Sequence, residues 1–199
     1  MSQVMISWPA RARYLVALGS NLPSSYGTSE KSLRHALDCT REYSCKLVNV
    51  SAFFSCPSFP AGNGPDYVNA AAEIEGPGHP REMLDILHAI EADFGRQRVQ
   101  RWGQRVLDLD LVAAGDVVMP DATNQAKWRN LPLEKQVELT PDELILPHPR
   151  LQDRAFVLVP LAQIAPEWRH PLIGLTVAEM LDRLEPQLLE QMKPLETPA

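Results

Sequence analysis

The chain has 199 residues, of which 45% are hydrophobic and 22% charged, and its formal net charge at pH 7 is −6. Composition of this kind is typical of a soluble globular domain. It excludes a wholly disordered chain, a collagen-like repeat and a disulfide-stabilised miniprotein. The negative net charge argues against binding of nucleic acid or of an anionic membrane by the chain as a whole. No stretch approaches the roughly 18 consecutive apolar residues that a membrane-spanning helix needs.

The cysteines and the N-terminal residues both predict a cytoplasmic protein. Cys39, Cys45 and Cys56 form no CxxC pair, and their spacing matches no zinc site. Three cysteines cannot all pair within one chain, so reduced thiols are expected. No apolar run of signal-peptide length precedes Arg11.

Hydrophobic patterning predicts elements in the order β-α-β-β-α-β, followed by one more helix. The expected strands are apolar or alternating runs at 14–19, 46–54, 67–75 and 107–113. The expected helices carry apolar residues at helical spacing and lie at 29–40, 80–94 and 176–184. Between the second and third strands lies a loop, 56–66, that is rich in proline and glycine, and loops of this length are often functional.

This order is the ferredoxin-like split βαβ pattern, an α+β fold with a mainly antiparallel sheet and helices packed on it. We expect a single domain over 1–199. Two segments fall outside the pattern, a polar insertion at about 117–143 and a loose C-terminal tail from about 186. The fold hosts many unrelated functions, so it does not by itself indicate an activity.

The fourth expected strand contains the sequence Leu-Asp-Leu-Asp-Leu at 107–111. On a strand the three leucines face the core, while Asp108 and Asp110 project from the other face, about 7 Å apart along the chain. Two carboxylates on one face repel each other unless a cation lies between them. The pattern therefore fits either a solvated strand face or a site for a hard cation, for which magnesium is well suited.

An arginine-rich loop, 95–105, leads directly into this strand. It contains two glycines, Trp102 and four arginines, which are Arg96, Arg98, Arg101 and Arg105. Arginine forks match the geometry of phosphate groups. Alone, the cluster is also compatible with a charged surface loop that pairs with acidic residues elsewhere. Next to two carboxylates it favours a magnesium–polyphosphate site, with arginines on the phosphates and aspartates on the metal.

Other polar and aromatic residues allow more than one interpretation. Tyr67 and Asn69 share one face of the third strand. An asparagine amide offers a donor and an acceptor to a flat heterocycle, although both residues also fit a solvated sheet face. His148 lies between two prolines and is either a structural loop residue or a contact to a phosphate or a base. Arg154 fits an ion pair with an acid, and Phe156 fits core packing better than a lid.

Several of these segments together resemble the 6-hydroxymethyl-7,8-dihydropterin pyrophosphokinase family. The most specific is the run GRxRxxRWGxRxLDLDL, which ends at Leu111. The similar stretches are 14–22, 65–71, 90–111, 146–159 and 164–167, so the resemblance extends over nearly the whole chain. It implies transfer of the β,γ-pyrophosphoryl group of ATP to the hydroxymethyl oxygen of the pterin, leaving AMP, in folate biosynthesis.

The resemblance also implies roles for individual residues of this sequence. Two magnesium ions are held by Asp108 and Asp110, and transfer is assisted by Arg96 and Arg105. The pterin is held by Asn69, lies between Trp102 and Phe156, and is flanked by Tyr67, Cys56 and Phe59. The residues that contact ATP are Leu84, His88, Glu91, Arg98 and His148. Arg154 matches a conformationally mobile arginine of the family.

The sequence departs from the family pattern at three places. Gln104 stands where the family usually has proline, so the loop beside Arg105 is expected to be less rigid. Cys56 stands where threonine is common, with little effect expected if that residue acts through its backbone. The 117–143 insertion is longer than in compact members, and it lies either over the nucleotide side or remote from it.

Two alternative functions remain open from the sequence. One is another magnesium-dependent Asp-x-Asp transferase that uses a nucleotide, and the other is a ferredoxin-like nucleic-acid-binding module. The net charge of −6 and the two aspartates on the sheet argue against the second. The expected partners are the small molecules ATP and 6-hydroxymethyl-7,8-dihydropterin, with no nucleic acid and no membrane, and the chain is expected to be a monomer.

Overall fold

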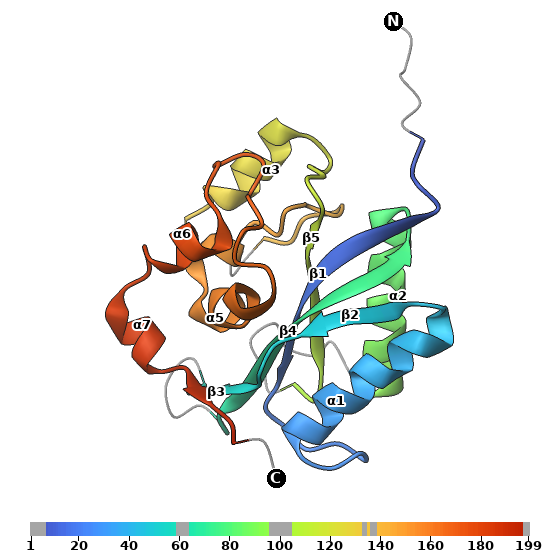
Figure 1. Cartoon of the computed structure of the whole chain (residues 1–199), viewed down its shortest axis with the longest axis vertical. Helices are drawn as coiled ribbons and strands as arrows, with labels where there is room; N and C mark the ends of the chain where they lie inside the picture. The colour runs from blue at the N-terminus through green and yellow to red at the C-terminus, as the bar shows by residue number, and fades with distance from the viewer. Residues whose placement is uncertain (1–6, 59–63, 96–104, 133–134, 136–138, 197–199) are drawn as a thin grey trace, which may run out of the picture.

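The computed structural model shows a six-stranded antiparallel sheet with helices on both faces (Figure 1). The structure describes residues 7–58, 64–95, 105–132, 135 and 139–196. The strands lie in the order β5-β1-β4-β3-β6, and β2 also pairs with β4. Their bounds are β1 Arg11–Ser20, β2 Lys46–Val50, β3 Phe54–Cys56, β4 Tyr67–Pro77, β5 Asp108–Ala114 and β6 Lys193–Pro194.

Two groups of helices cover the two faces of the sheet. The α-helices are α1 Ser29–Cys39, α2 Pro80–Asp93, α3 Ala122–Arg129, α5 Ala155–Ile164, α6 Val177–Leu181 and α7 Pro186–Glu190. Two short 3-10 helices are η1 Thr40–Tyr43 and η2 Leu151–Asp153. α6 is shorter than the helix predicted at 176–184, and it begins with a capping box formed by Thr176 and Glu179. Among the described residues, no helix is long and apolar enough to span a membrane.

The connectivity confirms the predicted ferredoxin-like pattern. β1 is the central strand, antiparallel to β4 on one side and to β5 on the other. The predicted strand 46–54 is instead two strands, β2 and β3. The interruption contains Ser51, whose N–H donates to the Ala71 carbonyl while its hydroxyl accepts the Ala71 N–H. A side-chain oxygen thereby takes the place of a ladder carbonyl, and the strand bends at this point.

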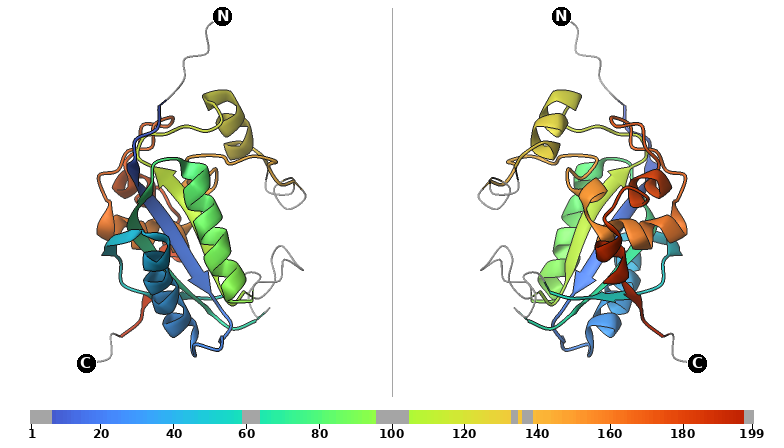
Figure 2. Two further views of the ribbon diagram at one scale, coloured as in Figure 1. Left: turned by 90° about the vertical axis from the view of Figure 1, so that its right-hand side faces the viewer. Right: turned by 90° about the vertical axis from the view of Figure 1, so that its left-hand side faces the viewer.

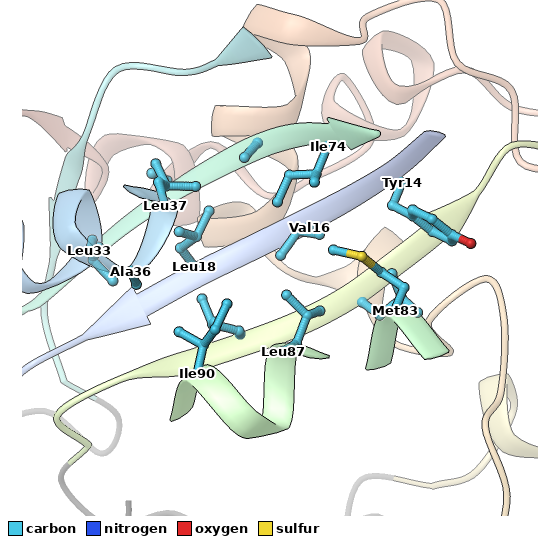
Figure 3. Close-up of a cluster of buried hydrophobic side chains, with 14 of the residues drawn as sticks. Tyr14, Val16, Leu18, Leu33, Ala36, Leu37, Ile74, Met83, Leu87 and Ile90 are labelled. Carbon is cyan, nitrogen blue, oxygen red and sulfur yellow. The ribbon is translucent and has the colours of Figure 1, made fainter. Parts of the chain in front are cut away.

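Alternation along the central strand separates two hydrophobic cores. Val16 and Leu18 point towards α1 and α2, where Leu87 of α2 is fully buried against them (Figure 3). Leu15 and Ala17 point to the opposite face and pack with residues of α5 and α6. Both faces of β1 are therefore buried, which explains why its sequence is apolar at consecutive positions.

Both ends of α2 follow from local sequence. The His79 side chain accepts a hydrogen bond from the Arg81 N–H, and Pro80 occupies the first turn, where a missing N–H costs nothing. Gly95 follows the helix with a φ of +75°, a left-handed conformation that glycine adopts without steric cost. Gly95 is also the first residue of the arginine-rich loop, whose residues 96–104 lie outside the described residues.

The predicted loose tail from about 186 is wrong for residues 186–195. This segment forms α7 and then β6, which pairs with β3 at the edge of the sheet (Figure 1). Met192 is 8% exposed and packs against Phe54 and Ala155, and the Leu195 N–H donates to the Phe53 carbonyl at 2.8 Å. Hydrophobic patterning does not predict this pairing, because a two-residue strand has no periodicity of its own.

His170 provides a test of the core beside α6. It is fully buried, its Nδ1 accepts from the Leu172 and Ile173 N–H groups, and burial lowers its pKa to about 4. In the unfolded chain the pKa is about 6.5, so only the unfolded state takes up this proton between pH 6.5 and 4. The contribution of neutral, buried His170 to the free energy of unfolding is therefore fully present above pH 6.5. It decreases by at most about 1.4 kcal/mol per pH unit as the pH falls towards 4.

Urea denaturation at pH 7, 5.5 and 4 should therefore show a steeper loss of stability in the unaltered chain than in His170→Gln, which cannot take up the proton. An equal pH slope in the two proteins would show that His170 is not the group responsible.

Candidate active site

The two aspartates of β5 lie on the face of the sheet that α5 covers. The alternating residues Leu109 and Leu111 point to the opposite face. They are 4% and 3% exposed and lie in the core beside α2. The Asp108 side chain is 18% exposed and that of Asp110 is 37% exposed, so both remain accessible. The predicted separation of leucines from carboxylates is confirmed.

Strand register places Asp108 in one row with a glycine and an asparagine from neighbouring strands. Asp108 pairs with Gly19 of β1, Gly19 pairs with Asn69 of β4, and Asn69 pairs with Phe54 of β3. A Cβ at Gly19 would lie 3.4 Å from Asn69 Oδ1 and 3.9 Å from Asp108 Cβ. The missing side chain therefore leaves no atom between the Asn69 amide and the Asp108 side chain at a point where a Cβ would contact both.

Neighbouring residues orient the Asn69 amide. Asn69 is 4% exposed, and its Nδ2 donates to Cys56 Sγ at 3.2 Å. Burial raises the pKa of Cys56, so the sulfur is a neutral thiol at pH 7. Tyr67, paired with Cys56 in the ladder, also has a pKa raised by burial and keeps its phenolic proton. Nδ2 is thus directed to β3 and Oδ1 to the Gly19 side.

An arginine accompanies each aspartate. Arg105 forms an ion pair and hydrogen bond with Asp108 Oδ2. Burial alone would lower the pKa of Arg105, but the carboxylates of Asp108 and Asp110 raise it above its ordinary value. Arg154 lies with Nη1 3.9 Å from Asp110 Oδ2, and its guanidinium is 5.4 Å from the ring centre of Phe156. The guanidinium groups offset the mutual repulsion of the two carboxylates.

His148 is held beside β5 as a neutral imidazole. Its backbone N–H donates to the Val112 carbonyl at 2.8 Å. Burial lowers its pKa to about 3, with the charges of Arg154 and Arg150 acting in the same direction. Nδ1 accepts the Arg150 N–H at 3.2 Å, so the proton of the neutral ring lies on Nε2. His148 therefore offers a hydrogen-bond donor, as expected for a residue that contacts an anion.

Glu91 differs from Leu84 and His88, the two other residues of α2 that the resemblance assigns to ATP contact. It is 2% exposed, and its Oε1 accepts the Leu109 N–H at 2.7 Å. This bond attaches α2 to β5 between the two aspartates. Leu84 and His88, on the same helix, are partly buried. Contact of these three residues with ATP stays a prediction.

Asn21 is a residue whose role the sequence analysis missed. It is 3% exposed, its Oδ1 accepts the Arg105 N–H at 2.8 Å, and its own N–H donates to the Arg105 carbonyl. Its Nδ2 donates to the Pro65 carbonyl at 3.3 Å. One side chain thus links the ends of two loops that flank the site. The sequence analysis included Asn21 only within the family-like stretch 14–22, although a polar residue directly after a buried strand was a usable signal.

The remaining predicted residues divide into two groups. Phe156 is 37% exposed at the start of α5, so the interpretation that it fills the core is wrong. Four predicted residues lie outside the described residues: Phe59, Arg96, Arg98 and Trp102. Within the described ranges, no group of three or more His, Cys, Asp or Glu residues could hold a metal ion.

Comparison with known proteins gives one consistent result. The family model of 7,8-dihydro-6-hydroxymethylpterin-pyrophosphokinase matches residues 15–166. A 2-amino-4-hydroxy-6-hydroxymethyldihydropteridine pyrophosphokinase from Methylorubrum extorquens is 32% identical over 181 residues, which cover 91% of this chain and 99% of that protein. One of the same name from Synechocystis is 39% identical over 121 residues, covering 61% of this chain and 52% of the relative.

Solved structures show a similar fold. The HPPK-DHPS protein of Plasmodium falciparum matches with a TM-score of 0.67 and 14% identity, covering 98% of this chain and 49% of that one. The chain thus spans about half the length of this protein and of the Synechocystis relative.

Asn21→Ala should destabilise the protein by about 1–3 kcal/mol, because the partly buried Arg105 N–H loses its acceptor and the loop at Pro65 loses its donor. Urea denaturation measures this change. Asn130→Ala removes an exposed asparagine amide and serves as the control. A loss below about 0.5 kcal/mol, the usual range for surface substitutions, would show that Asn21 is not a link between the loops.

Proposed function

The chain belongs to the 7,8-dihydro-6-hydroxymethylpterin-pyrophosphokinase family, and we propose that it transfers the β,γ-pyrophosphoryl group of ATP to the hydroxymethyl oxygen of 6-hydroxymethyl-7,8-dihydropterin. The products are the pterin diphosphate and AMP, and the reaction serves folate biosynthesis. The observation that carries the proposal is the row Asp108–Gly19–Asn69 across three strands. It brings a carboxylate for a metal–phosphate complex close to an amide for a heterocycle, with only a glycine between them.

The pterin would bind at the β3–β4 side of this row. Asn69 presents both a donor and an acceptor, and the contact of Nδ2 with Cys56 fixes which atom faces which way. Phe156, exposed on α5, supplies an aromatic face for stacking. Tyr67 flanks the same position on β4. The roles of Phe59 and Trp102 in this subsite stay predictions.

Asp108 and Asp110 have the chemistry of a magnesium site. Both offer hard carboxylate oxygens on one face of one strand, and both already lie against cationic groups, so the position favours positive charge. Two carboxylates completed by water and phosphate oxygens are the set that magnesium prefers over an all-protein cage. When bound there, magnesium neutralises the triphosphate and polarises the phosphoryl group under attack. Binding of two ions stays a prediction.

The remaining polar groups would align the phosphates. Arg105 and Arg154 can exchange a carboxylate for a phosphate oxygen, since their guanidinium groups are equally complementary to both. His148 donates from Nε2, and its neutral state avoids the cost of burying another charge. Phosphoryl transfer needs positioning and charge neutralisation rather than a covalent nucleophile. The roles of Arg96 and Arg98 stay predictions. So do the monomeric state, the cytoplasmic location and the absence of a nucleic-acid or membrane partner.

Product analysis tests the function directly. The protein is incubated with ATP, magnesium and the hydroxymethyl pterin, and AMP and ADP are resolved. AMP that forms only with the pterin supports the proposal. Asp108→Asn and Asp110→Asn should each reduce its rate by about 100-fold or more, because a neutral amide oxygen binds magnesium more weakly than a carboxylate does. ADP alone, or AMP that forms without the pterin, would contradict it and favour another Asp-x-Asp transferase or an ATPase.

Asn69→Ala should weaken pterin binding by about 10-fold or more, because the ring loses hydrogen bonds in a buried position. Titration calorimetry with the pterin and an ATP analogue separates the two ligands, and ATP binding should not change. The exposed Asn49 of β2 provides the matched control, Asn49→Ala. Unchanged pterin affinity in Asn69→Ala would place the heterocycle elsewhere.

A further inference from the structure

The insertion between β5 and His148 has no role in the proposed function so far. Its helix α3 follows β5 in the chain and lies beyond the end of that strand (Figure 2). α3 contacts the segment that carries His148. Hydrophobic patterning does not predict this contact, because it is made by hydrogen bonds rather than by apolar side chains.

Gln125 makes the central contact. Its side chain is completely buried, its Nε2 donates to the Pro147 carbonyl at 3.1 Å, and its Oε1 accepts from Arg129 Nη1 at 3.0 Å. Burial of an amide is unfavourable unless both ends are bonded, and here both are. Gln125 therefore holds the residue directly before His148 at a fixed distance from α3.

Two further contacts attach the insertion to the same segment. Met119 and Leu146 exchange backbone hydrogen bonds of 2.9 and 3.0 Å. The Arg150 guanidinium donates to the Arg129 carbonyl at the end of α3 at 3.3 Å. The insertion thus bonds the backbone of Leu146 and Pro147 before His148 and the side chain of Arg150 after it, while the His148 N–H is held by β5.

We propose that α3 is a positioning element for the nucleotide, and that Gln125 acts by fixing the orientation of the His148 imidazole towards the triphosphate. This inference rests on the proposed function and deepens it. Nε2 is the ring nitrogen that can donate to a phosphate oxygen, because Nδ1 accepts the Arg150 N–H. A donor that must meet a phosphate oxygen depends on where its backbone lies, and Gln125 bonds that backbone one residue away.

The test compares binding of a non-hydrolysable ATP analogue with magnesium, and separately of the pterin, by calorimetry. Gln125→Ala should weaken analogue binding by about 5- to 10-fold, while pterin affinity stays the same. Gln125→Glu keeps the size and the acceptor for Arg129 but cannot donate to Pro147 when ionised, so it should give a similar loss and replaces Gln125→Ala if that variant does not fold. Lys127→Ala, at an exposed position of the same helix, is the matched control and should not alter either affinity.

A double-mutant cycle distinguishes positioning from general destabilisation. If Gln125 acts through His148, the effect of Gln125→Ala on analogue binding should disappear in a His148→Ala background. Additive losses, equal losses for analogue and pterin, or an unchanged affinity in both Gln125 variants would overturn the inference. If the unaltered chain bound no ATP analogue and formed no AMP, the proposed function would fall first, and the nucleotide role of His148 with it.

Discussion

Successive side chains on a β-strand point to opposite faces of the sheet, and this alternation determines where the residues of the site lie. On β5 it sends Leu109 into the core and Asp108 and Asp110 to the other face. On β4 it does the same for Asn69, and because β1 lies between these strands with a glycine in the row, the carboxylate and the amide face a common space. A slip of one residue in either ladder would bury the charges and expose the leucines. Stability of the core and the geometry of the site therefore depend on the same register.

Charge compensation is the second condition that the site satisfies. Two carboxylates on one strand face would repel each other, and Arg105 and Arg154 offset this repulsion at separate carboxylates. The same oxygens are the candidate ligands of a divalent cation, so cation and guanidinium compete for them. Nucleotide phosphates give the displaced arginines new partners, which makes binding of metal and nucleotide mutually supportive rather than independent.

Sequence periodicity predicted the structure correctly where the pattern lies within a single strand or helix. The leucine–aspartate alternation, the shared face of Tyr67 and Asn69 and the ferredoxin-like strand order follow from patterns within one segment or from the order of segments. Contacts between distant segments carry no such signal. Asn21 acts on the arginine loop, Glu91 on the backbone of β5, and Gln125 on the carbonyl of Pro147, and each partner is known only once the chain is folded. All three are polar residues whose side chains are buried.

The pairing of β6 with β3 has a consequence for how the protein is made. During synthesis the ribosome releases β3 long before β6, so the edge of β3 stays bare while most of the chain has already emerged. An uncovered strand edge is a template for pairing with another nascent chain. Phe54, which lies in the row that ends the active-site face, would be exposed with it. Pairing of β6 therefore protects the edge of β3 only late in synthesis.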